Sequence, residues 1–289
     1  IMITELLSPA GSLKNMRYAF AYGADAVYAG QPRYSLRVRN NEFNHENLKI
    51  GIDEAHALGK KFYVVANIQP HNSKLKNFIR DIEPIIAMQP DALIMSDPGL
   101  IMMVREHFPD MPIHLSVQAN AINWATVKFW KDYGLSRVIL SRELALEEIE
   151  EIQKNVPEIE LEVFVHGALC MAYSGRCLLS GYMNKRDANQ GACTNACRWE
   201  YKIHEAQEDA NGDVIPVQQI EPSKQCCSNK VQDDLVQSVL VQRNDEEMFA
   251  AEEDEHGTYF MNSKDLRAIQ HVDRLTHMGI ASLKIEGRT

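Results

Sequence analysis

The sequence predicts an α/β fold, most specifically a (β/α)8 TIM-like barrel. The first observation is that short apolar runs alternate with stretches of helical periodicity, in eight units at a spacing of roughly 20–35 residues. The second is that the apolar runs carry hydrophobic residues on both faces, as strands of a buried parallel sheet do. A doubly wound open sheet is the alternative fold for this pattern.

Each expected strand is a short run of aliphatic, β-branched or aromatic residues bounded by polar residues or glycine. The expected strands are Glu5–Leu7, Ala26–Ala29, Phe62–Ala66, Ala92–Ser96, Ile113–Val117, Arg137–Leu140, Leu161–Val165 and Ser282–Ile285. The expected helices are Leu13–Tyr22, Glu46–Leu58, Leu75–Met88, Gly99–His107, Trp124–Tyr133, Leu146–Asn155 and Lys264–Met278. Four of these helices are followed by a glycine that suits a left-handed C-cap, namely Gly23, Gly59, Gly134 and Gly279.

One interval breaks the alternation, because more than a hundred residues separate Val165 from the strand at Ser282. Two strand-like runs within it, Trp199–Ile203 and Thr258–Met261, are expected to pair as a hairpin. Between them, Ala206–His256 is polar and acidic and is expected to be a flexible excursion. We therefore expect one TIM-like barrel domain over residues 1–289, with a cysteine-bearing insertion at residues 167–262. In such a barrel the loops that follow the strands carry the active site.

The composition excludes several classes of protein. Hydrophobic residues make up 45% and charged residues 24% of the 289 residues, which is ordinary for a globular protein. No apolar run approaches the ~18 residues of a membrane span, and the N-terminus does not resemble a signal peptide, so a cytoplasmic protein without a membrane partner is expected. The net charge of -10 gives no global indication of nucleic-acid binding, and no DNA partner is expected. Much of the acidic excess lies in residues 245–255, which leaves room for a local basic patch elsewhere.

All six cysteines lie between Cys170 and Cys227, which indicates a metal site rather than scattered disulfides. Cys170, Cys177, Cys193 and Cys197 follow a C-x6-C-x15-C-x3-C spacing. Four thiolates hold either zinc or an iron–sulfur cluster. The chain lacks the C-x2-C knuckles of most structural zinc sites, but zinc, a [4Fe-4S] cluster and unmetallated cysteines all remain open from spacing alone. The adjacent Cys226 and Cys227 are expected to be exposed thiols rather than ligands.

The cysteine region resembles a known family. The run Phe164-Val-His-Gly-Ala-Leu-Cys-Met-Ala-Tyr-Ser-Gly-Arg-Cys177 is similar to the signature of the family historically labelled collagenase-like peptidases. The similarity extends over nearly the whole chain, through the runs Glu5–Gly11, Gly23–Gly30, Asn262–Leu266 and Ser282–Arg288. Within the family, the chain most resembles bacterial members that hydroxylate tRNA, in the runs Gln31–Arg39, Gly191–Tyr201 and Glu253–Gly257.

The resemblance implies an RNA-modifying enzyme that converts the wobble uridine of the tRNA anticodon loop to 5-hydroxyuridine. It further implies an oxygen-independent reaction with prephenate as hydroxyl donor, and a [4Fe-4S] cluster held by Cys170, Cys177, Cys193 and Cys197. Some family members instead hydroxylate ribosomal RNA or quinone precursors, and these remain alternatives. A zinc-binding, non-catalytic RNA-binding module is a third. Members similar to this chain extend beyond residue 289, so we expect a C-terminal β domain that this sequence does not include.

Peptidase activity is not expected, despite the family label. The sequence contains neither the H-E-x-x-H motif of zinc peptidases nor the G-x-S-x-G elbow of serine hydrolases. Ser174 has no sequence cue for a neighbouring base. A cysteine nucleophile is formally possible, but four clustered cysteines are better explained as metal ligands.

Polar residues at the C-terminal ends of barrel strands are candidates for the site. His166, Arg142 and Glu286 are candidate catalytic residues, although each also has a structural reading as a loop-orienting, capping or ion-pairing residue. Asn67 and Gln118 are candidates for substrate binding, with turn capping as the alternative. Candidate RNA or donor contacts, with a solvated loop as the alternative, are Arg33, Tyr34, Arg37, Arg39, Arg176 and Arg288.

Overall fold

The protein was analysed as a computed structural model that describes residues 4–36, 41–168, 172–180, 188–190, 202–208, 214–216, 237–242, 249–253 and 265–287. The chain divides into two compact units, residues 1–194 with 264–289, and residues 195–263. None of the helices in these ranges has the length and apolar character needed to cross a membrane.

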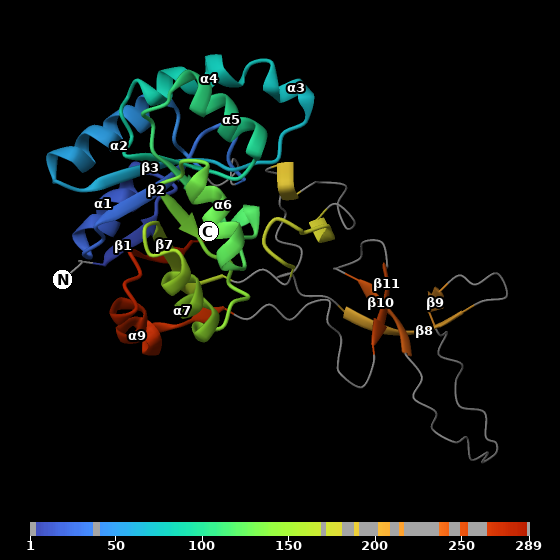
Figure 1. Cartoon of the computed structure of the whole chain (residues 1–289). Coiled ribbons are helices and arrows are strands. Elements are labelled where there is room, and N and C mark those ends of the chain that lie inside the picture. Colours follow the sequence, from blue (N-terminus) through green and yellow to red (C-terminus); the bar gives the residue numbers. More distant parts are fainter. Residues whose placement is uncertain are drawn as a thin grey trace, which may run out of the picture. The chain divides into compact units, whose positions relative to one another are not determined.

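The first unit is a closed barrel of eight parallel strands (Figure 1). The strands are β1 (Glu5–Pro9), β2 (Ala26–Gly30), β3 (Lys61–Ala66), β4 (Ala92–Met95), β5 (Ile113–Leu115), β6 (Arg137–Ile139), β7 (Glu160–Gly167) and β13 (Ser282–Glu286). Neighbours pair in chain order, β6 pairs with β7, and β13 fits between β7 and β1. The predicted TIM-like barrel is therefore confirmed, because these pairings close the ring that an open sheet would leave unpaired.

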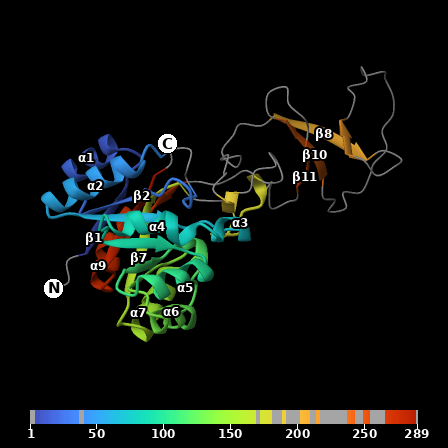
Figure 2. The same ribbon diagram turned by 90° about the horizontal axis from the view of Figure 1, so that it is seen from above.

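Helices cover the outside of the barrel (Figure 2). They are α1 (Leu13–Ala21), α2 (His45–Ala57), α3 (Asn72–Leu75), α4 (Phe78–Ile86), α5 (Pro98–His107), α6 (Trp124–Asp132), α7 (Leu146–Asn155) and α9 (Val272–His277). Side chains at the N-caps of α1, α2, α5 and α6 accept backbone N–H bonds, which satisfies donors that a helix start leaves free. The four glycines expected to end helices have positive φ angles.

Two expected helices differ in the structure. The helix predicted over Leu75–Met88 begins later, as α4 at the buried Phe78, because Leu75 ends the separate short helix α3 and residues 76–77 form a turn between the two helices. The segment predicted over Lys264–Met278 contains only the short α9. Its first part forms β12 (Leu266–Arg267), which pairs antiparallel with the end of β7, followed by a 3-10 turn at Ile269–His271. Strand pairing at the barrel rim therefore replaces helix there.

The second unit contains an antiparallel sheet in the order β11–β10–β8–β9. Its strands are β8 (Lys202–Glu208), β9 (Val214–Pro216), β10 (Gln237–Gln242) and β11 (Phe249–Glu253). Three of them lie inside the segment expected to be a flexible excursion, so that segment contains paired strands. The predicted hairpin is also corrected in part: Lys202 and Ile203 pair with β10, whereas Thr258–Met261 lies outside the described residues.

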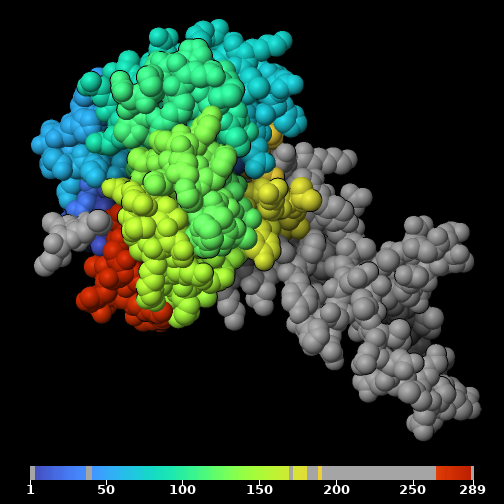
Figure 3. Space-filling model, in the orientation of Figure 1, coloured from blue at the N-terminus to red at the C-terminus, as the bar shows by residue number. Residues whose placement is uncertain are grey.

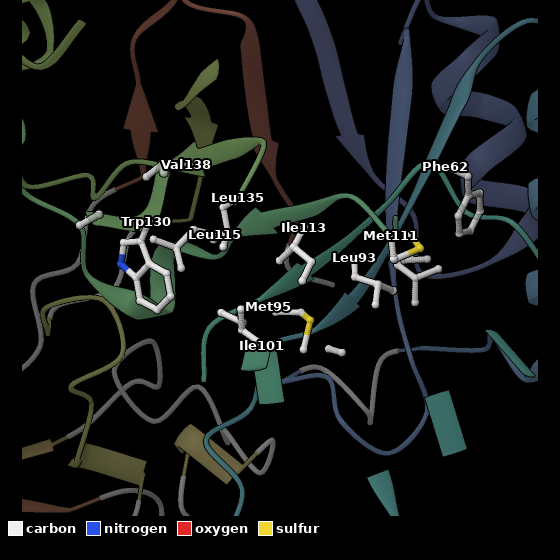
Figure 4. Close-up of a cluster of buried hydrophobic side chains, with 14 of the residues drawn as sticks. Phe62, Leu93, Met95, Ile101, Met111, Ile113, Leu115, Trp130, Leu135 and Val138 are labelled. Atoms are coloured by element: carbon white, nitrogen blue, oxygen red, sulfur yellow. The ribbon is translucent and has the colours of Figure 1, made fainter. Parts of the chain in front are cut away.

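The core has two layers, one between the barrel wall and the helices and one inside the barrel. Figure 4 shows the outer layer, where side chains of β3 to β6 meet α5 and α6. Trp130 of α6 and Ile101 of α5 lie among Met95, Leu115 and Val138 of the strands. Inside the barrel, Leu7, Tyr63, Ile94, Ile139 and Phe164 form a smaller cluster. This packing fixes the strand ends, and with them the site.

Candidate active site at the mouth of the barrel

Arg142 and Glu286 meet at the mouth of the barrel, as expected for residues at strand ends. Arg142 follows β6 and Glu286 ends β13, and Arg142 Nη1 lies 3.6 Å from Glu286 Oε2. The same Nη1 donates a hydrogen bond of 2.9 Å to the Ala168 carbonyl, and the guanidinium lies 4.5 Å above the centre of the Phe164 ring. Both charged side chains are at most 7% exposed. The mouth therefore contains a buried cation, held by a carboxylate, a carbonyl and an aromatic face.

Gly167 allows the ends of β7 and β13 to lie close together at the mouth. Its φ angle is +109°, and a Cβ there would lie 2.0 Å from the Glu286 carbonyl oxygen. The pairing of β7 and β13 shifts register between Lys284 and Ile285, which changes the direction of the following side chains. His166 emerges from this irregularity with an exposed side chain, at the register position opposite Arg267 of β12. It lies four residues before Cys170 in the chain.

Beneath the mouth lies a lysine that the sequence analysis missed. Lys284 is 4% exposed; its Nζ donates to Glu162 Oε1 at 2.9 Å and lies 4.1 Å from the centre of the Tyr28 ring. The Tyr28 hydroxyl donates to the Ile285 carbonyl at 3.0 Å. The signal was available in the sequence, because Ser282, Lys284 and Glu286 alternate along β13 and so share its inward face.

The floor of the barrel is a buried network of charges. Arg137 Nη1 lies 2.7 Å from Glu5 Oε1 and 3.1 Å from Glu162 Oε2. Burial raises the pKa of Glu5, but the guanidinium of Arg137 outweighs burial and holds the net pKa below its ordinary value. Burial lowers the pKa of Arg137, and the carboxylates of Glu162 and Glu5 raise it by more, so its charge is secure. The Glu5 carboxylate and the Arg137 guanidinium therefore both stay ionised.

Two further titratable residues lie in this floor and stay neutral. The Tyr63 hydroxyl donates to Glu5 Oε2 at 2.7 Å; burial, together with the nearby Glu5 carboxylate, raises its pKa far above the ordinary value. His114 packs edge-on against Tyr63, with ring centres 4.8 Å apart. Burial lowers the pKa of His114 well below its ordinary value, and the charges of Arg137 and Lys284 add to that effect.

Asn67 joins loops at the mouth through three hydrogen bonds. Its Nδ2 donates to Ser116 Oγ at 3.1 Å, its Oδ1 accepts the Leu36 N–H at 3.2 Å, and its carbonyl accepts the Ser96 hydroxyl at 2.8 Å. Gln118 lies in the short 3-10 helix after β5 (Val117–Ala119), and its backbone N–H donates to Ser116 Oγ at 3.4 Å. Asn67 thus ties the loops after β2, β4 and β5 together.

The loop after β2 places its arginine and tyrosine differently. Tyr34 is 1% exposed, its ring packs edge-on against Phe78 at 5.1 Å, and its hydroxyl lies 3.2 Å from Asp81 Oδ2. This corrects the expectation that Tyr34 contacts RNA or the donor, because a ring buried in the core has no free face. Arg33 remains 57% exposed and pairs with Asp81 at 2.5 Å. Buried Gln31 shapes the turn, since its Oε1 accepts the N–H groups of Arg33 and Tyr34.

Residues 172–180 and 188–190, here called the cysteine segment, contact loops at the mouth of the barrel. Figure 3 shows residues 172–180 in yellow on the surface of the first unit. Cys177 is half-buried and forms no disulfide, and its carbonyl accepts a hydrogen bond from Asn189 Nδ2 at 3.2 Å. The Asn189 carbonyl in turn accepts the N–H of Gln69, in the loop after β3, at 3.1 Å. Gly175 lies directly against the loop after β5, since a Cβ on it would be 2.1 Å from the Gln118 carbonyl oxygen. Arg176 is exposed on this segment.

Several predicted site residues lie outside the described residues. They are Arg37, Arg39, Cys170, Cys193, Cys197 and Arg288, together with Cys226 and Cys227. The proposed set of four thiolates is therefore represented in the structure by Cys177.

Comparison with known proteins identifies the family. The family model described as peptidase family U32 matches residues 11–289. The chain belongs to peptidase family U32. The chain is 72% identical, over 99% of its length, to the tRNA hydroxylation protein P of Escherichia coli (strain K12), and 71% identical, over 99%, to the protein of that name in Haemophilus influenzae. It spans 64% and 63% of the length of these two relatives.

More distant members of the family include an enzyme named for ribosomal RNA. The chain is 36% identical, over 70% of its length, to the 23S rRNA 5-hydroxycytidine C2501 synthase of Escherichia coli, of which it covers 30%. Among solved structures, the U32 peptidase Mk0906 matches with a TM-score of 0.51 and 12% identity, over 58% of this chain and 71% of that one. At that identity the likeness supports the fold alone.

Proposed function

We propose that this family U32 chain is part of a tRNA-modifying enzyme that hydroxylates C5 of the wobble uridine to 5-hydroxyuridine. The observation that carries the proposal is the 72% identity over 99% of the chain to a tRNA hydroxylation protein. The fold is compatible with it, because the strand ends and the Cys177 segment meet at one mouth, where a TIM-like barrel places its site. An anticodon loop presents its bases already unpaired, which suits an enzyme that must reach one base.

The proposal includes a [4Fe-4S] cluster bound by Cys170, Cys177, Cys193 and Cys197. Cys177 suits a ligand, since its thiol is not in a disulfide, it is half-buried, and its backbone is held to the barrel through Asn189. Such a cluster would supply Lewis-acid or electron-transfer chemistry at the mouth. His166, exposed at the end of β7, is placed before the first of these cysteines and suits a role in orienting their loop or moving a proton.

Prephenate is proposed as the hydroxyl donor, so that the reaction does not need molecular oxygen. A donor with two carboxylates requires cations at the site. The buried guanidinium of Arg142, beside Glu286, and the exposed Arg176 on the cysteine segment bring positive charge to this mouth. Arg33 offers a further exposed cation for a tRNA phosphate.

Hydroxylation of ribosomal RNA is the second candidate, because the chain is 36% identical to a 23S rRNA 5-hydroxycytidine synthase. The tRNA proposal is preferred because identity is twice as high and coverage of this chain is nearly complete for the tRNA relatives. Peptidase activity is not proposed. Ser174 is 4% exposed and so is not presented to a peptide substrate.

Two measurements test the proposal. Deleting the gene that encodes this chain should remove wobble 5-hydroxyuridine derivatives from total tRNA, measured by mass spectrometry of nucleosides, while 5-hydroxycytidine in 23S rRNA stays unchanged. Normal tRNA hydroxylation in a strain without a paralogue contradicts the proposal, and loss of the rRNA nucleoside alone favours the second candidate.

A second measurement tests the cluster. Protein purified without air should contain iron and sulfide and absorb broadly near ~400 nm, and Cys193→Ala should lose the iron, the sulfide and the absorption. Zinc at one per chain would contradict the cluster.

A further inference from the structure

Two adjacent residues of opposite charge follow β6 and contact the two sides of the Cys170 position. Arg142 Nη1 donates to the carbonyl of Ala168, two residues before Cys170, at 2.9 Å. Glu143 Oε1 accepts the backbone N–H of Ser174, four residues after Cys170, at 3.2 Å. The positively charged Arg142 thus donates to a carbonyl, and the negatively charged Glu143 accepts from an N–H group. Both hydrogen bonds therefore have one charged partner, which makes them stronger than neutral ones.

The environment of each residue supports a holding role. Arg142 is itself fixed, since its side chain is 5% exposed and lies beside Glu286 and over Phe164. Ser174 is 4% exposed although it belongs to a loop, so the Glu143 contact holds a segment that is packed down on the barrel. Immediately after it, Gly175 lies against the Gln118 carbonyl with no room for a side chain. The barrel thus fixes Ala168 and Ser174, six residues apart, from a single dipeptide.

We propose that Arg142 and Glu143 form a clamp that positions the cysteine segment on the mouth of the barrel. Holding the backbone at Ala168 and Ser174 in place lowers the entropy cost of binding a ligand beside them. Arg142 and Glu143 are in this sense positioning residues, which act through Cys170 and Cys177 and need not touch a substrate. The inference rests on the proposed function for the role of the cysteines, but the contacts that carry it belong to the chain without any metal.

The test compares three variants of the full-length protein. Glu143→Ala removes the acceptor for Ser174, whereas Glu143→Gln keeps an oxygen acceptor in the same place. Glu148→Ala is the matched control, because Glu148 Oε2 makes the same kind of bond, to the backbone N–H of Ala145 at 2.7 Å, on an exposed helix start away from the cysteine segment. Glu143 and Glu148 are both exposed, so the barrel should fold in each of the three variants, and its thermal midpoint is measured as a check.

The first readout is the rate at which iodoacetamide alkylates the thiols of metal-free protein. Trypsin separates the two thiols of interest, since residues 155–176 contain Cys170 and residues 177–185 contain Cys177 as their one cysteine. Glu143→Ala should raise both rates by about fivefold, the change expected for loss of one partly buried hydrogen bond. Glu143→Gln should stay within about twofold of wild type, and Glu148→Ala should match wild type. The second readout is the rate of iron loss to a chelator from loaded protein, with the same order expected.

The outcomes separate this inference from the proposed function. If Glu143→Ala is alkylated no faster than Glu148→Ala, the clamp is refuted, whether or not the wild type contains iron. If wild-type protein contains no iron but Glu143→Ala is alkylated faster and Glu143→Gln is not, the clamp stands and the cluster fails. Arg142→Ala provides an independent check: alkylation of Cys170 should rise more than that of Cys177, because Ala168 is closer to Cys170 in the chain.

Discussion

Arg137→Met is expected to destabilise the barrel by about 3–5 kcal/mol, the cost of leaving a buried carboxylate without its charge partner. The side chains of Arg137, Glu5 and Glu162 are only 3%, 8% and 0% exposed, so water cannot replace the missing guanidinium. Methionine retains an apolar stem of similar length, which limits the cavity left behind. The loss is therefore electrostatic in the main rather than a loss of packing.

Of the two carboxylates, Glu5 loses more stabilisation than Glu162 when Arg137 is replaced. Glu162 keeps Lys284 at 2.9 Å when Arg137 is removed. Glu5 keeps neutral hydrogen-bond donors, Tyr63 at 2.7 Å and Ser282 at 3.0 Å, with only Lys61 at 3.3 Å as a charged partner. Adding Glu5→Gln to Arg137→Met removes the unpaired buried charge. The double variant should therefore lose less free energy of unfolding than the two single variants lose together, by about 1–3 kcal/mol.

The pH dependence has a definite sign. Because the net pKa of Glu5 is depressed below its ordinary value of 4.5, its pairing contributes stability that is fully present above pH 4.5 and is lost as the pH falls below that value. Without Arg137, burial should raise the pKa of Glu5 instead. The difference in stability between wild type and Arg137→Met should therefore narrow as the pH approaches and passes below 4.5.

Urea denaturation followed by circular dichroism measures these differences, with the free energy of unfolding extrapolated from the midpoint and slope. The reasoning is refuted if Arg137→Met costs less than about 1 kcal/mol near neutral pH, since that is the value of an exposed ion pair. A double variant whose loss equals the sum of the single losses would equally refute it, because it would show that Arg137 and Glu5 act independently.

Three other substitutions test the mouth and its loops. Gly175→Ala should undock the cysteine segment, because the new Cβ meets the Gln118 carbonyl and φ is +74°; alkylation of Cys177 should rise while the barrel's thermal midpoint holds. Asn67→Ala removes bonds to Ser116 and Leu36 and should cost about 1–3 kcal/mol in urea denaturation. Arg33→Ala should leave stability within about 0.5 kcal/mol, since exposed ion pairs contribute little, but should weaken tRNA binding in a salt-dependent way; unchanged affinity would remove Arg33 from the interface.

The barrel itself was predictable because its strands are locally marked. Ala26–Ala29 and Ala92–Ser96 are apolar runs that follow a helix and a turn, and the strands β2 and β4 occupy almost the same residues. Burial on both faces leaves little room for a polar residue, so composition alone identifies such strands. Arg142 and Glu286 were predictable for the related reason that strand ends converge at one mouth.

The interior charges were not predicted, because a charged residue within a strand is normally assigned to solvent. Glu5, Arg137 and Glu162 lie in three different strands, and only closure of the barrel brings them within hydrogen-bonding distance. Three strands of the second unit, β9, β10 and β11, were missed for a similar reason. Phe249–Glu253 has a composition with weak strand propensity, and its partner β10 lies in a stretch that is otherwise polar, so pairing rather than local sequence defines both.

The balance of charge within the barrel favours the mouth as the place where a charged substrate would be recognised. Glu5 and Glu162 contribute two negative charges to the floor, and Arg137 and Lys284 contribute two positive ones. Because these opposite charges are paired at short distances, their electrostatic fields largely cancel at the mouth of the barrel. The field acting on a substrate above Phe164 would therefore come mainly from the charges around the mouth itself. Those charges belong to Arg142, Glu286 and the loops that hold the cysteine segment. If the proposed function holds, the barrel serves as a rigid support for the cysteines that the proposed clamp at Arg142 and Glu143 would position.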